Sequence, residues 1–297
     1  MRVLTNMLGL EKDNNRILFW LMIPSFLILF IITIFPLIGS FLSSLFKWNL
    51  ANPDQRDFIG LQNFIRLFTE GDFWYSVFLT LYQVIGTVVG QLILGMLIAL
   101  LLARKFKGVK ILRSLYLIPM MTTPIVAGLI WKMLFNPERG MINYILSFIG
   151  INDINWLGNS NLAMPAIIIT DLWLSTPFVT VILLAGIMSI PKDYTEAAKI
   201  DGAGAFRSFW HITLPLLKPM IWLALLFRVM DAIKRFDTIY VMTGGGPGRS
   251  TETLDLYAYF QSFDYLNIGY GASIAIIMLI IMFILSMFIL RSVQKSS

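Results

Sequence analysis

Six long apolar segments, separated by shorter polar ones, dominate the pattern of hydrophobic positions along the chain. Each is long enough for the roughly 20 residues that an α-helix needs to cross the hydrocarbon layer of a membrane. The pattern therefore predicts an all-α integral membrane protein with six transmembrane helices, forming a single transmembrane domain over residues 1–297. We expect the spans at residues 17–46, 75–103, 111–135, 164–190, 220–242 and 268–290.

Composition supports the assignment to the membrane proteins and excludes functions that depend on cysteine. The 297 residues are 57% hydrophobic and only 13% charged, and the mean hydropathy is +0.76. Soluble domains carry roughly 25% charged residues. The chain has no cysteine, which excludes disulfides, thiolate metal sites and cysteine nucleophiles.

The distribution of basic residues predicts the orientation of the spans. With the N-terminus in the cytoplasm, fourteen Lys and Arg residues fall in inner segments and their flanks, and five fall in outer segments. Because cytoplasmic loops of membrane proteins are enriched in these residues, we expect both termini inside. The net charge of +6 is then explained by membrane topology, and we do not expect a nucleic-acid partner.

A polar segment at residues 191–219 separates the fourth and fifth apolar runs and faces the cytoplasm in this orientation. Pro191 suits the first turn of a helix, and Ala197 and Ala198 are strong helix formers with almost no side chain. Gly202 and Gly204 then end the helix. Its small-residue face suits docking into the groove of a partner protein. An interfacial loop without a partner is the alternative.

Four motifs resemble the permease subunits of binding-protein-dependent ABC importers, and in particular those that import carbohydrates. Glu196-Ala197-Ala198, followed by Gly202 and Leu214-Pro215, is similar to that family's EAA loop. The other three are residues 57–64, which resemble the outer F-x-G-L-x-N-F segment, residues 236–247, which resemble the exit of the fifth span, and Phe35-Pro36.

This resemblance implies a set of partners. A short cytoplasmic helix in the 191–219 loop is expected to couple the chain to an ATPase subunit through Glu196, Ala197, Ala198, Asp201 and Gly202. The implied assembly has a second, related permease chain, two ATPase subunits that carry ATP and magnesium, and a solute-binding protein docking near residues 47–74 and 243–266. The chain itself would bind no cofactor and catalyse no reaction. Its place would be the cytoplasmic (inner) membrane of a bacterium or archaeon.

Two features of the sequence resemble nucleotide-binding or catalytic motifs but do not match them. The glycine-rich run at residues 244–251 lacks the Gly-Lys-Ser/Thr ending of a phosphate-binding loop, and no apolar strand precedes it. His211 is the only histidine, so we expect neither a metal site nor a catalytic triad.

The fifth apolar run is unusual because it contains five ionisable residues. Arg228, Asp231 and Arg235 share one helix face through their i,i+3 and i,i+4 spacing. Charges within a span are costly, and they mark a functional site by default. In one interpretation Arg228 pairs with Asp231 and Lys234 with Asp237 to hold the span in register. In the other these residues line a path for a polar solute.

Alignment on the family's motifs implies which residues contact that solute. The solute is expected to be a carbohydrate, and in particular a di- or oligosaccharide. The chain departs from the family's neutral amides in the fifth span, which leaves another polar solute, such as a phosphorylated polyol, as an alternative. An ion-coupled secondary transporter is a further one. The implied positions are Leu174, Ser175, Phe178, Arg228, Asp231, Ala232 and Arg235.

Overall fold

The structure of the protein, a computed structural model, describes residues 22–104 and 106–296. The described chain is mostly helical and forms two compact units. One unit comprises the segments up to Leu67 together with Gln261–Ile276, and the other comprises Phe68–Phe260 with Ile277–Ser297. Residues 17–21, where the first span is predicted to begin, lie outside the described residues. The single-domain assignment stays a prediction.

Four helices in the described residues are long and apolar enough to cross a membrane: Met22–Ser44, Gly71–Leu102, Ala163–Ser189 and Ile268–Gln294. Two further candidates are bent pairs of helices. In the first pair Val109–Met121 and Pro124–Leu134 meet at 96°, and in the second Ala205–Leu216 and Lys218–Ile233 meet at 65°. The fold is therefore that of a helical membrane protein with four to six spans.

The smaller unit consists of a long apolar helix, a short hairpin and helical segments. Its polar centre is the amide of Asn63, which donates to the carbonyl oxygens of Ser44 at 2.8 Å and Phe46 at 3.0 Å. Asn63 thereby fixes the hairpin to the end of the apolar helix. The elements that begin in this unit are η1 (Phe30–Ile34), α3 (Phe35–Ser44), β1 (Phe46–Trp48), antiparallel β2 (Arg56–Phe58), α4 (Gln62–Thr69) and α16 (Ile268–Ser296).

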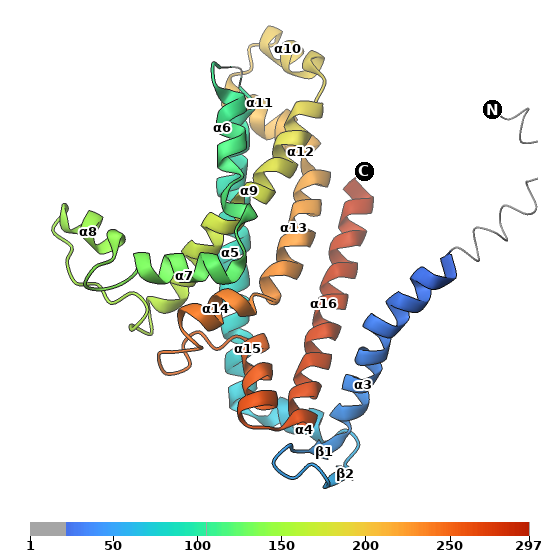
Figure 1. Ribbon diagram of the computed structural model, residues 1–297. Helices are drawn as coiled ribbons and strands as arrows, with labels where there is room; N and C mark the ends of the chain where they lie inside the picture. Colours follow the sequence, from blue (N-terminus) through green and yellow to red (C-terminus); the bar gives the residue numbers. More distant parts are fainter. Residues whose placement is uncertain (1–21, 105, 297) are drawn as a thin grey trace, which may run out of the picture. The chain divides into compact units, whose positions relative to one another are not determined.

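The larger unit contains the remaining helices, and Figure 1 places α10 at one end of it and α14 and α15 at the other. Its elements are α5 (Gly71–Leu102), α6 (Val109–Tyr116), η2 (Pro119–Met121), α7 (Pro124–Leu134), α8 (Met141–Ser147), α9 (Ala163–Ser189), α10 (Lys192–Ile200), α11 (Ala205–Ser208), η3 (Phe209–Thr213), α12 (Leu214–Leu216), α13 (Lys218–Ile233), α14 (Phe236–Met242), α15 (Leu254–Tyr259) and η4 (Phe260–Asp264), which begins at its edge.

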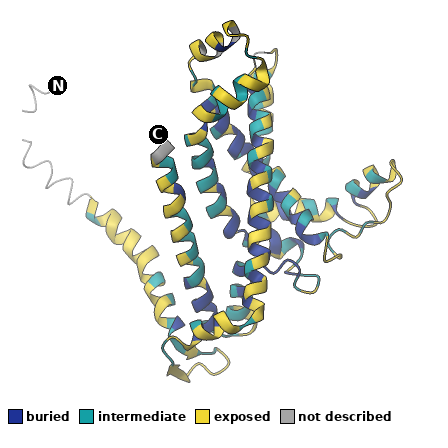
Figure 2. Ribbon diagram, turned by 180° about the vertical axis from the view of Figure 1, so that it is seen from behind, coloured by how far each residue is buried: buried dark blue, intermediate teal, exposed yellow. Residues whose placement is uncertain are grey.

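The core of this unit is the contact of α5 with α9, with α13 packed against both. Buried residues are frequent on α5 and α9, whereas the helix that contains α3 is exposed along most of its length (Figure 2). α5 and α9 approach closely because α5 carries glycines where they meet. A Cβ at Gly95 would lie 2.8 Å from Cγ1 of Val179 and 3.4 Å from the backbone nitrogen of Thr180.

Gly95→Val is expected to destabilise the folded protein by about 1–3 kcal/mol, because the added side chain would overpack a contact that includes main-chain atoms. The measurement is the thermal unfolding midpoint of the detergent-solubilised protein. Gly39→Val is the matched control, because Gly39 is also in a helix and has no neighbouring atom within 4 Å of the added Cβ position. Equal effects of the two substitutions would contradict the close α5–α9 contact.

The third and fifth apolar runs are not single straight helices as their length predicted. In the third run Thr122 and Thr123 are extended, and Pro119 and Pro124 begin separate helical segments on either side. Proline has no N–H to continue a helix and disfavours helical geometry in the residue before it. The fifth run is interrupted at Lys234 and Arg235, between α13 and α14.

Candidate functional site

The carboxylate of Asp171 in α9 lies between two arginine side chains of the fifth apolar run. Its Oδ1 is 3.1 Å from Nε of Arg235, and its Oδ2 is 3.5 Å from Nη2 of Arg228. The exposed fractions are 0% for Asp171, 3% for Arg228 and 8% for Arg235. A buried charge without a partner costs several kcal/mol, so each of these groups depends on the others.

Two polar residues hold this cluster in place. Gln91 of α5, which is completely buried, donates from Nε2 to the main-chain oxygen of Asp171 at 3.1 Å and accepts from Nε of Arg228 at 2.7 Å. Ser175 lies one turn after Asp171, donates to its Oδ1 at 3.2 Å and accepts from Nη2 of Arg235 at 3.4 Å. Three segments of the chain are thus joined at one buried point.

The interruption after α13 brings Arg235 into this cluster. α13 ends at Ile233, and Arg235 has φ −82° and ψ 54°, outside helical geometry. Its side chain nevertheless still reaches Asp231, one turn earlier, with Nη2 3.7 Å from Oδ2. The break therefore lets one guanidinium approach both Asp171 and Asp231.

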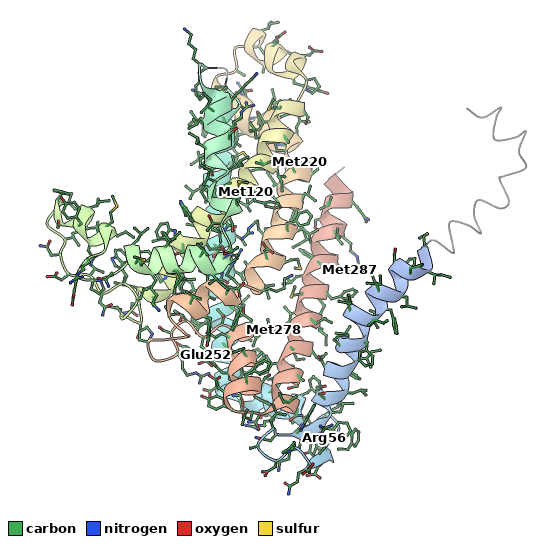
Figure 3. The ribbon with its side chains drawn as sticks, viewed as in Figure 1. Arg56, Met120, Met220, Glu252, Met278 and Met287 are labelled. Carbon is green, nitrogen blue, oxygen red and sulfur yellow. The ribbon has the colours of Figure 1, made fainter. Side chains whose placement is uncertain are left out.

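A cavity of about 230 Å³ opens beside the cluster. Asp231 is its exposed charge: 58% of the side chain is accessible, and its Oδ2 accepts from Nη1 of Arg228 at 2.9 Å. Phe178 contributes an aromatic ring, which packs edge-on against Phe227 with 5.9 Å between ring centroids. The cavity thus combines charge-paired polar groups with an aromatic ring. The residues that line it are Met120 (labelled in Figure 3), Thr122, Pro124, Leu174, Ser175, Phe178, Arg228, Asp231 and Arg235.

Six of the seven residues expected along the solute path line this one cavity, although they come from α9, α13 and the α13–α14 junction. Ala232 is the exception. It is 1% exposed and packs with Val84 and Val88 of α5 in a hydrophobic cluster. Its place on α13 turns it toward α5, because it follows Asp231 by one residue, or about 100° around the helix.

The two interpretations of the fifth-run charges are both partly realised. Arg228 pairs with Asp231, as the pairing interpretation predicted. Between Lys234 and Asp237, no ion pair is found in the described part of the chain. The same Arg228 and Asp231 also line the cavity. Pairing and lining are therefore not exclusive.

Sequence reasoning did not place Asp171 or Gln91 in this site. The sequence carries a signal for Gln91, because the polar residues Gln83, Thr87 and Gln91 recur every four residues in an apolar run. All three are fully buried in the structure. Lys132 of α7 also makes a contact between helices, because its Nζ donates to the main-chain oxygen of Val241 at 2.9 Å, near the end of α14. Cations are favourable at helix C-termini.

The predicted helix in the 191–219 segment is present as α10. Gly202 has φ +73°, a conformation that favours glycine, and the N–H of Ala203 donates to the carbonyl of Ala198 at 2.8 Å. This pattern is a Schellman cap, which ends α10 at a defined point. Of the five residues expected to couple to an ATPase, Ala198 is buried within the chain and the other four are exposed. Their role in coupling stays a prediction.

The segment after α14 is fixed by Arg249. Its guanidinium contacts both carboxylate oxygens of Glu252, at 2.9 and 3.0 Å, and Asp72 at the start of α5, at 2.6 Å. These contacts, chiefly the hydrogen bonds with Glu252, raise the pKa of Arg249 above its usual value. The glycine-rich run 244–251 is accordingly a structured turn, with Glu252 (labelled in Figure 3) buried beneath it.

Asp255 in α15 follows this turn, and burial raises its pKa to about 6, although Thr253 and the N–H of Leu256 donate to its Oδ1. Since the folded-state pKa is above the unfolded value, the stability that Asp255 contributes is complete below pH ~4 and is lost as the pH rises through about 6.

Asp255→Asn is expected to keep the acceptor atom and to remove this pH dependence. At pH 7.5 the variant should be more stable than the native protein by roughly 2–3 kcal/mol, and at pH 4.5 by only about 1 kcal/mol. Thermal unfolding of both proteins at the two pH values measures the difference. The same gain at both values would contradict the assigned pKa.

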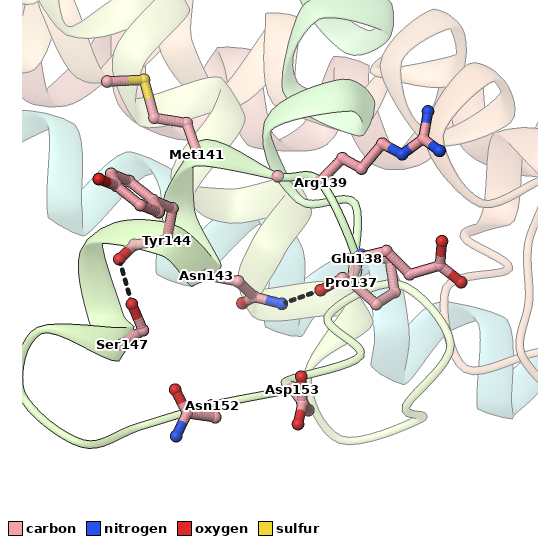
Figure 4. Close-up of a pocket in the computed structure, with 10 residues that line it drawn as sticks. Pro137, Glu138, Arg139, Met141, Asn143, Tyr144, Ser147, Asn152 and Asp153 are labelled. Atoms are coloured by element: carbon pink, nitrogen blue, oxygen red, sulfur yellow. Dashed lines mark hydrogen bonds between the residues drawn. The ribbon is translucent and has the colours of Figure 1, made fainter.

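A second, polar cavity of about 430 Å³ lies within residues 137–153 (Figure 4). Its buried amide, Asn143, is fully engaged. It donates to the carbonyls of Pro137 and Ile154, at 3.0 and 2.8 Å, and accepts from Nε1 of Trp156 at 2.7 Å. Asn143 therefore fixes the fold of this segment, and the cavity has no buried group left for a ligand.

The apolar spans and the charge-paired cavity between α9 and α13 define a helical membrane protein with a polar site in its interior. Residues 91–296 match the family model described as binding-protein-dependent transport system inner membrane component. The chain belongs to this family, and the resemblance inferred from its motifs is confirmed. It is accordingly a multi-pass inner-membrane transport component of the ABC permease class.

The chain is similar along nearly its whole length to permeases of known name. It is 40% identical to the trehalose/maltose transport system permease protein MalF of Thermococcus litoralis, covering 93% of this chain and 92% of the relative. It is 36% identical to the sulfoquinovosyl glycerol transport system permease protein SmoG of Agrobacterium fabrum, covering 91% and 87%. Among solved structures, a bacterial ABC transporter that imports the acidic polysaccharide alginate matches with a TM-score of 0.82 at 22% identity, covering 97% and 99%. This last likeness supports the fold.

Proposed function

We infer that the protein is a permease subunit of an ATP-driven importer for a carbohydrate, and in particular for a di- or oligosaccharide. Its relatives at 30–40% identity include permeases of trehalose, maltose and multiple-sugar transport systems. The observation that carries the proposal is the cavity itself, where six of the predicted path residues meet. The charge-paired polar groups, together with the ring of Phe178, suit the hydroxyl edges and apolar ring faces of a sugar.

The chain would supply half of the translocation path, with a second, related permease chain supplying the other half. We place both termini in the cytoplasm, with six spans in which the third and fifth are bent. A solute-binding protein would dock on the outer segments near residues 47–74 and 243–266. One structure of the alginate transporter contains its periplasmic binding protein, which supports a partner of this kind.

Two ATPase subunits, binding ATP and magnesium, would drive the cycle from the cytoplasmic side. The α10 helix would seat in a cleft of one ATPase, with Glu196, Ala197, Asp201 and Gly202 at or near the contact. The exposed position of α10 at one end of its unit, beyond the ends of α9 and α13, supports this role (Figure 1). Because its Schellman cap ends α10 at a fixed residue, a displacement of the helix would be passed to the spans on both sides.

The test of this function is purification of the protein in mild detergent, identification of the chains that accompany it, and reconstitution of the complex in proteoliposomes. We expect the second permease and the ATPase to co-purify, and neutral disaccharide uptake to require ATP and the binding protein. Uptake by the isolated chain, driven by an ion gradient without ATP, would identify a secondary transporter and contradict the proposal. Uptake of a phosphorylated polyol in preference to saccharides would contradict the carbohydrate assignment.

Arg235→Ala is expected to lower saccharide uptake about tenfold or more, because the arginine side chain lines the cavity. The effect on the amount of assembled complex should be smaller, because Arg228 still pairs with Asp171 in the variant. Uptake and complex yield are measured on the same preparations. A loss confined to yield would show that Arg235 serves only to pair Asp171.

A further inference from the structure

We propose that Asp171 makes this cavity selective for neutral saccharides, by cancelling the charge of the two arginines that line it. Asp171 does not line the cavity itself; it acts as a positioning residue through Arg228 and Arg235. The inference rests on the proposed function, since it concerns which carbohydrates the same cavity accepts.

The first observation is the charge balance. Two guanidinium groups, Arg228 and Arg235, face two carboxylates, Asp171 and Asp231, and each carboxylate is within 4 Å of both arginines. The three buried residues, Asp171, Arg228 and Arg235, together carry two positive charges and one negative charge. With Asp231 included the cluster is neutral. A ligand in the cavity therefore meets no excess positive charge that would favour a carboxylate or sulfonate.

The second observation is that five of the six guanidinium nitrogens of these arginines face protein oxygen atoms. Nε of Arg228 donates to Gln91, its Nη1 donates to Asp231, and its Nη2 faces Asp171. For Arg235, Nε faces Asp171 and Nη2 donates to Ser175. Arginine recognises anionic groups best through two parallel N–H bonds from one edge. Neither arginine has an edge with both nitrogens uncommitted to the described residues.

The third observation is the group that the cluster does present. Asp231 has 58% of its side chain exposed and uses Oδ2 for both arginines. No hydrogen bond to its Oδ1 is found among the described residues. A carboxylate oxygen only accepts hydrogen bonds, so it suits a sugar hydroxyl and repels an acidic sugar. The cavity is thus built to accept from a neutral polyhydroxyl ligand.

The experiment measures ligand binding by the purified transporter complex in nanodiscs. No solute-binding protein is added, because the selectivity of that protein would mask the selectivity of the permease. The probes are a panel of neutral di- and trisaccharides, including trehalose and maltose, and uronic-acid disaccharides such as digalacturonate. The readout is the concentration of each probe that gives half of the maximal rise in unfolding temperature. The native complex should bind a neutral saccharide more tightly than any uronate.

Asp171→Asn should shift this preference toward uronates by about tenfold or more, because one negative charge is removed within 4 Å of two arginines in a low-dielectric site. The double variant Asp171→Asn, Arg235→Gln restores the charge balance and should return the preference toward the neutral probes. A purely structural role for Asp171 predicts no such rescue. Failure of the single variant to shift the ratio, or of the double variant to restore it, would overturn the proposal.

Asp231→Asn provides the same test at the exposed end of the cluster, should Asp171→Asn fail to assemble. It also removes one negative charge, so the ratio must again shift toward uronates, and an unchanged ratio overturns the proposal. A native complex that prefers uronates overturns the neutral selectivity and leaves the carbohydrate function standing. A native complex that binds no saccharide of the panel contradicts the carbohydrate function itself.

Discussion

Glu196→Lys is expected to reduce ATP-driven solute uptake by the reconstituted transporter at least about tenfold, while the complex still assembles and hydrolyses ATP. Glu196 is exposed on α10, so a lysine there should leave the fold intact. Reversal of a charge at a docking surface places like charges together and costs several kcal/mol of interaction. The expected result is thus a transporter in which hydrolysis no longer drives uptake.

Parallel measurements of uptake and of ATPase rate in the same proteoliposomes test this expectation. Glu138→Lys is the matched control, since Glu138 is also exposed but lies in the 137–153 segment, far from α10 in the same unit (Figure 1). It should leave uptake near the native level. Solute-stimulated uptake that survives Glu196→Lys would count against the coupling role of α10.

Asp171→Ala is expected to destabilise the folded protein by roughly 3–5 kcal/mol, because it leaves two buried arginines with a single, partly exposed partner. Yield after solubilisation and the thermal unfolding midpoint report the loss. Asp231→Ala is the control, since it removes the same group from the same cluster where 58% of the side chain is exposed. Exposed ion pairs contribute about 0–1 kcal/mol. Equal losses of stability in the two variants would contradict the view that the burial of Asp171 determines how much it stabilises the fold.

The long spans could be predicted because an uninterrupted apolar run has one favourable structure in a membrane. α5 and α9 follow the predicted runs 75–103 and 164–190 to within a few residues. The bends could not be predicted from apolarity alone. In the third run two prolines did mark the break, but the fifth run has no proline after Pro219. There α13 ends at Ile233, and Arg235, which follows the break, pairs with Asp171 of another helix.

The candidate site was predictable in part for a similar reason. Arg228 and Asp231 are three residues apart on one helix, so their pairing follows from sequence spacing. The partner that buries Arg228, Asp171, is 57 residues away in another helix. The pattern of residues within α9 and within α13 does not predict which faces of the two helices contact each other. Gln91 and Asp171 therefore had to be found in the structure.

The interruption between α13 and α14 has a consequence for the interior of the bilayer. At such a junction the first amides of the second helix lack helical partners, and no side chain caps the start of α14. Hydrocarbon offers these groups nothing to bond with, so we expect solvent to reach them. Amide protons of residues 236–238 should accordingly exchange with deuterium far faster than those in the middle of α9. We expect the level of Arg235 to be hydrated, so that a sugar there can exchange water for protein contacts one hydroxyl at a time.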